Sequence, residues 1–323
     1  MHTCQPPKKV LNKWLKSYDS TIEGYGHLLL EQKIPNDDEI ESGLVPYFES
    51  AHADARAVFH KYAGISLHPD DGAPGCHAQY PKCLPPITRS GLFGEVLSGM
   101  LTEAFPFIGE HQWIVPVFLF RKHEDVAQYM FTLSRDRARV RQVLGRKGDD
   151  FIGLAVDKKG SVTRVIAGEA KWRKTWNQST LDAVMLGEKI VDPSGGGKKI
   201  NNGKGVWFEI NRALNPPMGL KQLQDILIEL APDEYAETIL SLDRVLALEN
   251  QDAIERTDLI LLVGGGAASR EAGDALLEIE EVPDEYEAGR DLQVVEIILN
   301  DGGHLITNLY DRLFADGGDD ADD

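Results

Sequence analysis

The chain has few cysteines and no long apolar run, and each shortage excludes a class of protein. Three cysteines in 323 residues form no disulfide framework and fit a reducing compartment. The longest apolar segments, such as 259–263, are far shorter than the roughly 20 residues that cross a bilayer. Lys8 and Lys9 are not followed by an apolar segment, so no secretory signal is expected. The sequence therefore predicts a cytoplasmic protein without membrane contact.

Basic residues are also in short supply, and their distribution matters more than their number. The 34 Lys and Arg face 52 Asp and Glu, and the net charge of −18 argues against a polyanionic partner. Residues 231–323 hold 25 Asp and Glu against 5 Lys and Arg, whereas residues 121–174 hold 14 Lys and Arg against 7 Asp and Glu. Because a local field steers a polyanion, the basic block keeps DNA open as a partner. The acidic C-terminal third is predicted to dock a basic partner surface or to keep the chain off DNA.

The remaining composition is that of a globular protein, with 42% hydrophobic and 27% charged residues. Residues 1–89 are predicted to form a small N-terminal region of helices and loops, with helices at 1–16 and 47–63. Residues 90–315 are predicted to form an α/β domain, and the acidic residues 316–323 a disordered tail.

The α/β domain is predicted from the alternation of helical and strand-like periodicity. Helices are expected at 91–105, 124–143, 178–190, 219–231, 233–249, 268–278 and 303–315. Extended segments are expected at 113–120, 150–156, 162–170, 257–263 and 292–299. This order predicts a mixed sheet of about five strands with helices on both faces.

The two strands expected at 150–156 and 162–170 carry the most informative residues of the chain. A turn of sequence Asp-Lys-Lys-Gly joins them, so they are predicted to pair as a hairpin. Glu169 and Lys171 are two residues apart and point to the same face, and the hairpin brings Asp150 to the same end. Two carboxylates can share a Mg²⁺ ion, and Lys171 would orient or deprotonate the attacking water. This pattern predicts the site of a metal-dependent nuclease.

Each of these residues also has a structural interpretation. A Glu-x-Lys pair is common as a solvated charge pair, but Gly168 allows a close approach at the strand end, and the residues before it are apolar. Asp149 competes with Asp150 as the metal ligand, and alternation favours Asp150 because apolar residues at every second following position then share its face. Glu95 is either an exposed glutamate of its helix or a third carboxylate of the metal site.

Several residues near this pattern are predicted to contact nucleic acid, although each also fits a solvated surface or a helix cap. They are Arg146, Lys147, Arg164, Arg173, Lys174 and Gln178. Trp172 and Trp176 are candidates for base stacking or for the core. A loop expected at 193–205 contains glycines and lysines without the spacing of a P-loop, so no bound nucleotide is expected. The same loop is predicted to be mobile and to contact DNA or a partner.

Three segments carry a resemblance to a known family. They are FGEVLSGML at 93–101, KGDDFIGL at 147–154 and GEAKW at 168–172. In this order they resemble the HamA nuclease subunits of the Hachiman anti-phage defence system, a family similar to the PD-(D/E)xK restriction-endonuclease-like superfamily. The resemblance covers about residues 90–190, with a vaguer match over 292–315.

The resemblance implies a restriction-endonuclease-like fold and an active-site set of Glu95, Asp150, Glu169 and Lys171. It also implies action on DNA with Mg²⁺, for which Mn²⁺ can substitute, and a helicase partner, HamB. The predicted function is therefore a Mg²⁺-dependent DNA nuclease that acts as the effector of a bacterial anti-phage complex. The alternative is a non-catalytic adaptor with a degenerate nuclease fold that binds DNA or a helicase.

Overall fold

The computed structural model describes residues 1–22, 25–63, 80–122, 149–194, 197–247, 254–277 and 281–315. Its strands are β1 (Leu15–Ile22), β2 (Tyr25–Gln32), β3 (Trp113–Ile114), β4 (Phe151–Val156), β5 (Val162–Trp176), β6 (Lys189–Val191), β7 (Lys199–Asn201), β8 (Glu255–Gly266) and β9 (Asp291–Ile298). Its helices are α1 (Lys8–Trp14), α2 (Asp38–Ala63), α3 (Pro86–Ala104), α5 (Gln178–Met185), α6 (Val206–Asn211), α7 (Gly219–Leu230), α8 (Ala236–Ala247) and α9 (Gly302–Arg312). Two short 3₁₀ turns, η1 (Ile108–Glu110) and η2 (Leu119–Lys122), lie between α3 and β4.

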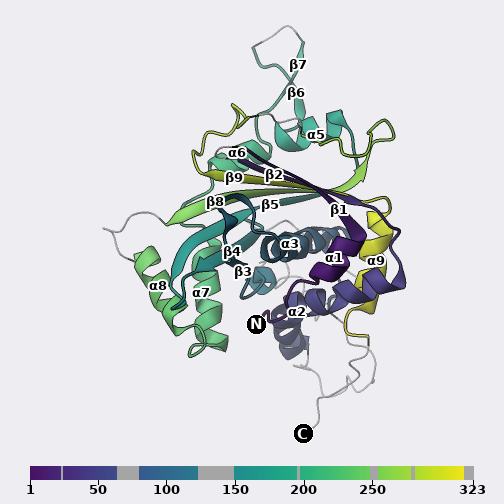
Figure 1. The fold of residues 1–323 in the computed structure, drawn as a ribbon. Helices are drawn as coiled ribbons and strands as arrows, with labels where there is room; N and C mark the ends of the chain where they lie inside the picture. The colour runs from purple at the N-terminus through teal and green to yellow at the C-terminus, as the bar shows by residue number, and fades with distance from the viewer. Residues whose placement is uncertain are drawn as a thin grey trace, which may run out of the picture.

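Seven strands of the described residues form one mixed sheet in the order β1-β2-β9-β8-β5-β4-β3. The central strands β2, β9, β8 and β5 are parallel, and antiparallel strands flank them on each side. Both faces of the centre are buried, which explains why β8 contains an unbroken apolar run at 259–263. The sheet curls, as Figure 1 shows, so it has a concave and a convex face.

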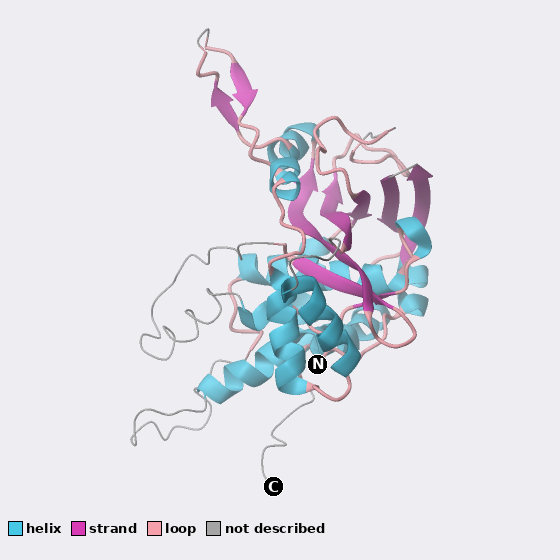
Figure 2. Cartoon of the chain, turned by 90° about the vertical axis from the view of Figure 1, so that its left-hand side faces the viewer, coloured by secondary structure: helices cyan, strands magenta, loops and turns pink. Residues whose placement is uncertain are grey.

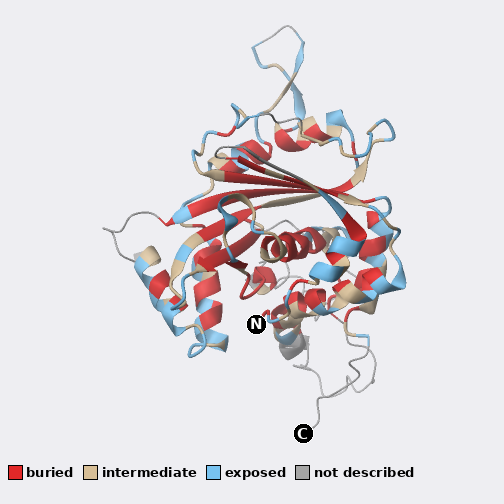
Figure 3. Cartoon of the chain, in the orientation of Figure 1, coloured by how far each residue is buried: buried red, intermediate tan, exposed pale blue. Residues whose placement is uncertain are grey.

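Different helices cover the two faces of the sheet. α1, α2, α3 and α9 share the largest core cluster on the concave face. On the convex face, α5 and α6 cover β8 and β9, whereas α7 and α8 cover β4 and β5. Figure 3 shows the buried residues along the sheet and on the helix sides turned toward it. The prediction of a mixed sheet with helices on both faces is confirmed.

β4 and β5 form the hairpin predicted from the sequence. They pair antiparallel with Phe151 opposite Gly168, and β5 continues past residue 170 to Trp176. A Cβ atom on Gly168 would lie 1.7 Å from the carbonyl oxygen of Leu259 on β8. Only glycine therefore lets β5 and β8 pair at the position before Glu169.

The N-terminal region differs from its prediction. The helix expected at 1–16 is α1, which ends at Trp14, and the next residues form β1. β1 and β2 join the central sheet, which has seven strands in the described residues rather than about five. β2 pairs with β9 and is largely buried, so its sequence lacks the alternation that marks a half-exposed strand. The helix expected at 47–63 begins earlier, at Asp38.

The prediction of a helix at 268–278 is wrong for the residues that the structure describes. Residues 268–277 form turns and bends instead. The backbone N–H groups of Leu276 and Leu277 donate to the buried Glu296 carboxylate at 2.5 and 2.9 Å, in place of the carbonyls that a helix would offer. Gly273 has a φ of +90°, which also interrupts a helix. The helix expected at 124–143 and the tail at 316–323 lie outside the described residues.

β6 and β7 form a small hairpin that projects from the body of the protein, as Figure 2 shows at its upper left. β7 lies within the loop expected at 193–205, so part of that loop is regular structure. Among the residues that the structure describes, no helix has both the length and the apolar composition needed to span a bilayer.

Candidate active site

Asp150, Glu169 and Lys171 meet at one end of the β4–β5 hairpin. The N–H of Asp150 donates to the carbonyl oxygen of Gly168 at 2.9 Å, and the N–H of Ala170 donates to Asp150 Oδ2 at 3.2 Å. Lys171 Nζ donates to Glu169 Oε2 at 2.8 Å. The register of the hairpin therefore places two carboxylates and one ammonium group together.

The three side chains lie on the convex face of the sheet. Ala167, two residues before Glu169, packs in the core formed with α7 and α8, so Glu169 and Lys171 share that face. Ala170 lies on the opposite face, where its Cβ is 3.3 Å from the position that a Cβ on Gly94 of α3 would take. Strand alternation thus separates the charged residues from the helix α3.

Asp150 rather than Asp149 faces the candidate site. Asp149 is buried, and its Oδ1 accepts a hydrogen bond from Arg256 Nη2 at 2.5 Å. Asp150 lies within hydrogen-bonding reach of Glu169 and accepts the N–H of Ala170. The two adjacent acids have different partners, and this geometry agrees with the choice of Asp150 as the metal ligand.

A buried ion-pair cluster holds Asp149 in place. The cluster, called the Arg256 cluster below, consists of Asp149, Arg256, Asp258, Tyr286 and Arg290. Arg256 Nε donates to Asp258 Oδ1 at 2.7 Å. Tyr286 Oη and Arg290 Nε donate to Asp258 Oδ2 at 2.7 and 2.8 Å. Acidic and basic groups are therefore paired within the cluster, as buried charges require.

The two arginines of this cluster also hold the backbone at the end of α6. Arg256 Nη1 donates to the carbonyl oxygen of Leu214 at 2.7 Å, and Arg290 Nη2 donates to that of Ile210 at 2.8 Å. Burial alone would lower the pKa of Arg256, but the neighbouring carboxylates outweigh burial and raise it. The Arg256 cluster thus links the residue before Asp150 to the helix on the other side of the site.

α6 contributes a residue that sequence reasoning missed. Glu209 Oε2 lies 3.4 Å from Lys171 Nζ, and the Glu209 side chain is 48% exposed. The ammonium group of Lys171 therefore lies between Glu169 and Glu209. The sequence could have indicated α6, because the buried Trp207 and Ile210 have helical spacing, although the helix is only 6 residues long. Only the tertiary structure shows that Glu209 reaches Lys171 on β5.

The electrostatic environment of the site favours a cation beside Glu169. Burial and the charge of Asp150 raise the pKa of Glu169 well above its ordinary value, although Lys171 acts in the opposite direction. Burial would lower the pKa of Lys171, but the charges of Glu169 and Asp150 outweigh burial and raise it. Lys171 is therefore protonated at neutral pH. A protonated lysine removes no proton from water, so of its two predicted roles the orientation of water fits better.

Glu95 does not join this group. It is buried on α3, on the concave side of the sheet, and its charge raises the pKa values of Tyr80 and Tyr310 beyond the effect of their own burial. Within the described residues, no three His, Cys, Asp or Glu side chains form a metal-binding group. The candidate site therefore offers two carboxylates to a metal instead of the expected three. The interpretation of Glu95 as an exposed helix residue is also wrong, since it is only 6% exposed.

The basic residues predicted to contact nucleic acid have different environments. Arg146 and Lys147 lie outside the described residues. Arg173 and Lys174 are exposed near the end of β5. Arg164, at the other end of β5, is ion-paired with two carboxylates at 2.6 and 2.8 Å. Two of the predicted contacts are thus open to solvent on the strand that carries Glu169 and Lys171.

The remaining predicted contacts belong to α5 and to the core. Asn177 caps α5 by accepting a backbone N–H, while Gln178 Nε2 donates to Asp182 Oδ1 at 2.8 Å. Trp176 is buried in the core, which leaves no surface for base stacking. Trp172 is partly buried and packs against the concave-face core. Among the residues that the structure describes, the candidate site thus consists of Asp150 just before β4, Glu169 and Lys171 on β5, and Glu209 on α6.

Comparison with known proteins adds no family assignment to this geometry. Neither the protein-family models nor the curated proteins compared with the chain give a match. The fold and the site define an α/β protein with a partly buried acidic site beside a protonated lysine. Such a site can bind a hard divalent cation and place an ammonium group next to it.

Proposed function

We propose that this chain is a Mg²⁺-dependent DNA nuclease with a restriction-endonuclease-like fold. The observation that carries the proposal is the meeting of Asp150, Glu169 and Lys171 on two adjacent antiparallel strands. The charge of Asp150 contributes to the raised pKa of Glu169, because two neighbouring carboxylates repel each other. A divalent cation bound between them would offset this repulsion. Mg²⁺ is commonly held by one or two carboxylates and keeps several waters, so this donor set fits it.

Each charged residue then has a distinct role. Asp150 and Glu169 would hold the metal, which when bound polarises a phosphate oxygen and lowers the pKa of a bound water. Lys171, as an ammonium group, orients the attacking water and offsets the negative charge that develops on the phosphate. Glu209 holds Lys171 from the side of α6, opposite to Glu169. The Arg256 cluster fixes the backbone before Asp150.

The resemblance of residues 90–190 to the HamA subunits extends the proposal to a biological setting. In that setting the chain is the effector of a bacterial anti-phage complex and acts with a helicase partner. The exposed Arg173 and Lys174 supply positive charge on the strand that carries the site, where DNA phosphates would lie.

A plasmid-nicking assay with a HamB-type helicase, in Mg²⁺ or in EDTA, tests this proposal. The variant Glu169→Ala/Lys171→Ala should lose nicking by about 100-fold or more, because it removes a metal ligand and the ammonium group. The matched control is Lys221→Ala/Asp225→Ala, which removes an exposed ion pair of 3.0 Å on α7 and should cut like wild type. Equal nicking by wild type and the Glu169/Lys171 variant would refute the proposal.

A second candidate function is a non-catalytic adaptor that binds DNA or a helicase through a degenerate nuclease fold. One observation favours it: Lys171 pairs with both Glu169 and Glu209, as lysines in purely structural ion pairs do. Calorimetric titration with Mg²⁺ separates the two functions. If the chain is a nuclease, wild type should bind Mg²⁺ saturably and the Glu169/Lys171 variant should not. If it is an adaptor, wild type and the variant should give the same titration.

A further inference from the structure

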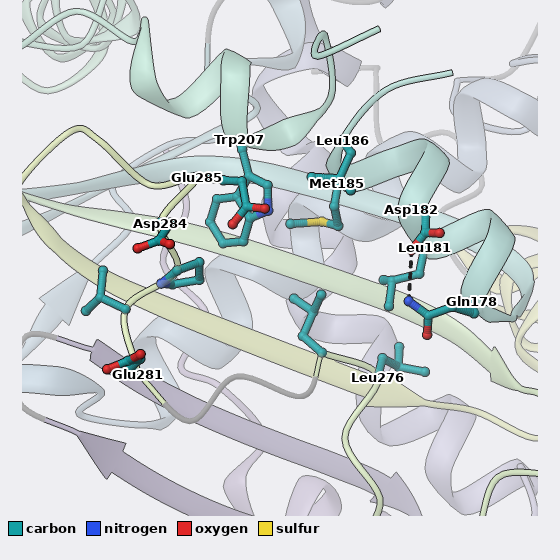
Figure 4. A pocket seen from close by; sticks show the side chains of 13 residues that line it. Gln178, Leu181, Asp182, Met185, Leu186, Trp207, Leu276, Glu281, Asp284 and Glu285 are labelled. Atoms are coloured by element: carbon teal, nitrogen blue, oxygen red, sulfur yellow. Dashed lines mark hydrogen bonds between the residues drawn. The ribbon is translucent and has the colours of Figure 1, made fainter. Parts of the chain in front are cut away.

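A groove of about 560 Å³ lies between α5, α6 and the described residues 276–277 and 281–285. Its floor is apolar and includes Leu181 and Met185 of α5, Trp207 of α6, and Leu276. Figure 4 shows Met185 and Leu181 between Asp182 on one side and Glu281, Asp284 and Glu285 on the other. A groove of this volume with an apolar floor has room for side chains of another molecule.

The rim of the groove carries charge of one sign. Asp182, Glu281, Asp284 and Glu285 line it, and the described lining residues include no lysine, arginine or histidine. These four acids form no metal-binding group among the described residues. The negative potential disfavours DNA, and the apolar floor disfavours a simple cation. Charge complementarity instead calls for an occupant that is both cationic and apolar.

We propose that this groove docks a short amphipathic segment of a partner protein, with apolar side chains on the floor and lysine or arginine side chains at the acidic rim. A groove with an apolar floor recognises the apolar face of such a segment, and the rim charges select it over acidic segments. Three of the four rim acids, Glu281, Asp284 and Glu285, belong to the acidic C-terminal third of the chain.

The groove lies next to the candidate site and shares structure with it. Trp207 and Glu209 are on the same helix, α6, and Glu209 contacts Lys171. Tyr286, directly after the rim residue Glu285, donates to Asp258 of the Arg256 cluster. A docked segment would therefore lie against the two elements that border the site. Docking itself is independent of nuclease activity and is measured without DNA or metal.

Fluorescence anisotropy with a labelled peptide tests the docking. The probe is a peptide of roughly 14 residues with leucines at helical i, i+3, i+4 spacing and lysines elsewhere, at physiological ionic strength. The variant Asp284→Lys/Glu285→Lys should bind it about tenfold more weakly or worse, because two rim charges are reversed. The matched control, Asp233→Lys/Glu234→Lys, reverses an exposed acidic pair before α8 and should bind within about twofold of wild type.

Two further measurements separate the floor from the rim. Leu276→Ser should weaken binding several-fold without changing the charge, because Leu276 lines the floor. A peptide with glutamate in place of every lysine should not bind. Equal weakening by the two charge-reversal variants would show general attraction to an acidic chain and overturn the proposal, as would the absence of saturable binding. Light scattering that shows a dimer dissociated by Asp284→Lys/Glu285→Lys would identify a second copy as the occupant and also overturn it.

Discussion

The Arg256 cluster and the candidate site begin at neighbouring residues, Asp149 and Asp150, yet their charges are arranged in opposite ways. In the Arg256 cluster, two carboxylates face two guanidinium groups, and the side chains of Arg256 and Asp258 are fully buried. In the candidate site, as far as the described residues show, three carboxylates (Asp150, Glu169 and Glu209) lie around one ammonium group, that of Lys171, and Glu209 is about half exposed.

The difference in charge balance indicates that the Arg256 cluster has a structural role, whereas the candidate site is able to bind ions. A balanced and closed cluster has no use for a further ion, so its contribution is to hold the backbone. An open cluster with excess negative charge can accept a cation and a charged substrate. Equivalent substitutions in the two clusters should therefore have different effects. In the Arg256 cluster they should change stability, and in the candidate site they should change activity.

The largest effect is expected from Arg256→Met. The substitution removes the buried guanidinium group that pairs with Asp149 and Asp258, and Asp258 keeps only Arg290 as a cationic partner among the described residues, which should lower the free energy of unfolding by about 3–5 kcal/mol. Urea denaturation followed by circular dichroism measures it. Lys171→Met is the matched change in the open cluster and should cost about 1 kcal/mol or less, because Lys171 is partly exposed. A similar loss of stability in Arg256→Met and Lys171→Met would show that the two clusters contribute equally to stability, contrary to this prediction.

The next effect comes from the adjacent pair Asp150→Asn and Asp149→Asn. Asp150→Asn should reduce Mg²⁺ affinity and nicking by about 100-fold with little change in stability, because it removes a proposed ligand. Asp149→Asn should instead lower stability by about 1–3 kcal/mol and reduce Mg²⁺ affinity by about tenfold at most, since its buried carboxylate pairs with Arg256. Calorimetric Mg²⁺ titration and urea denaturation on both variants measure this contrast. The reverse pattern would make Asp149 the ligand.

The open cluster should also make Mg²⁺ binding depend on pH. The folded-state pKa of Glu169 is raised, so lowering the pH through that pKa protonates Glu169, and the proton competes with the metal. Mg²⁺ affinity should therefore fall with decreasing pH below the raised pKa, by up to about tenfold per pH unit, and be highest at pH values above that pKa. Titrations at several pH values measure the effect. In Glu169→Gln the weak residual binding should lose this dependence, and a dependence that persists would assign the proton to another group.

The smallest effect is expected at Glu209. Glu209→Gln removes a charge from Lys171 but keeps an acceptor, and the side chain is about half exposed. Nicking should change by about threefold to fivefold and the free energy of unfolding by about 0.5 kcal/mol or less. Glu188→Gln, at an exposed position after α5, is the control and should leave both unchanged. A loss of about 100-fold would show that Glu209 is a metal ligand.

The sequence predicts the candidate site well where it depends on local rules. Asp150, Glu169 and Lys171 were placed together by strand alternation and one turn, and the observed register of β4 and β5 agrees. Gly168 was expected to allow a close approach, and the carbonyl of Leu259 supplies the reason. The placement of Asp150, Glu169 and Lys171 requires only the residues from Asp150 to the end of β5, whereas the reason for Gly168 lies on β8.

The rest of the site depends on contacts between distant residues. The residues left two interpretations of Glu95 open, and the resemblance placed it at the metal, but α3 packs on the concave face. The sequence does not specify which face a helix covers. Glu209 was missed because α6 is short and its contact with Lys171 depends on how α6 packs on the sheet. The turns at 268–277 form because Glu296, on β9, accepts their N–H groups.

The length of chain between contacting residues sets the order in which these parts form during synthesis. The β4–β5 hairpin can pair once Trp176 has left the ribosome, and this already brings Asp150, Glu169 and Lys171 together. Arg256 is 107 residues after Asp149, and Arg290 follows later still. The buried charges that fix Asp149 are therefore supplied only when β8 and β9 have been made. An unfinished chain therefore carries Asp150, Glu169 and Lys171 on a hairpin before the buried charges that fix Asp149 have been made.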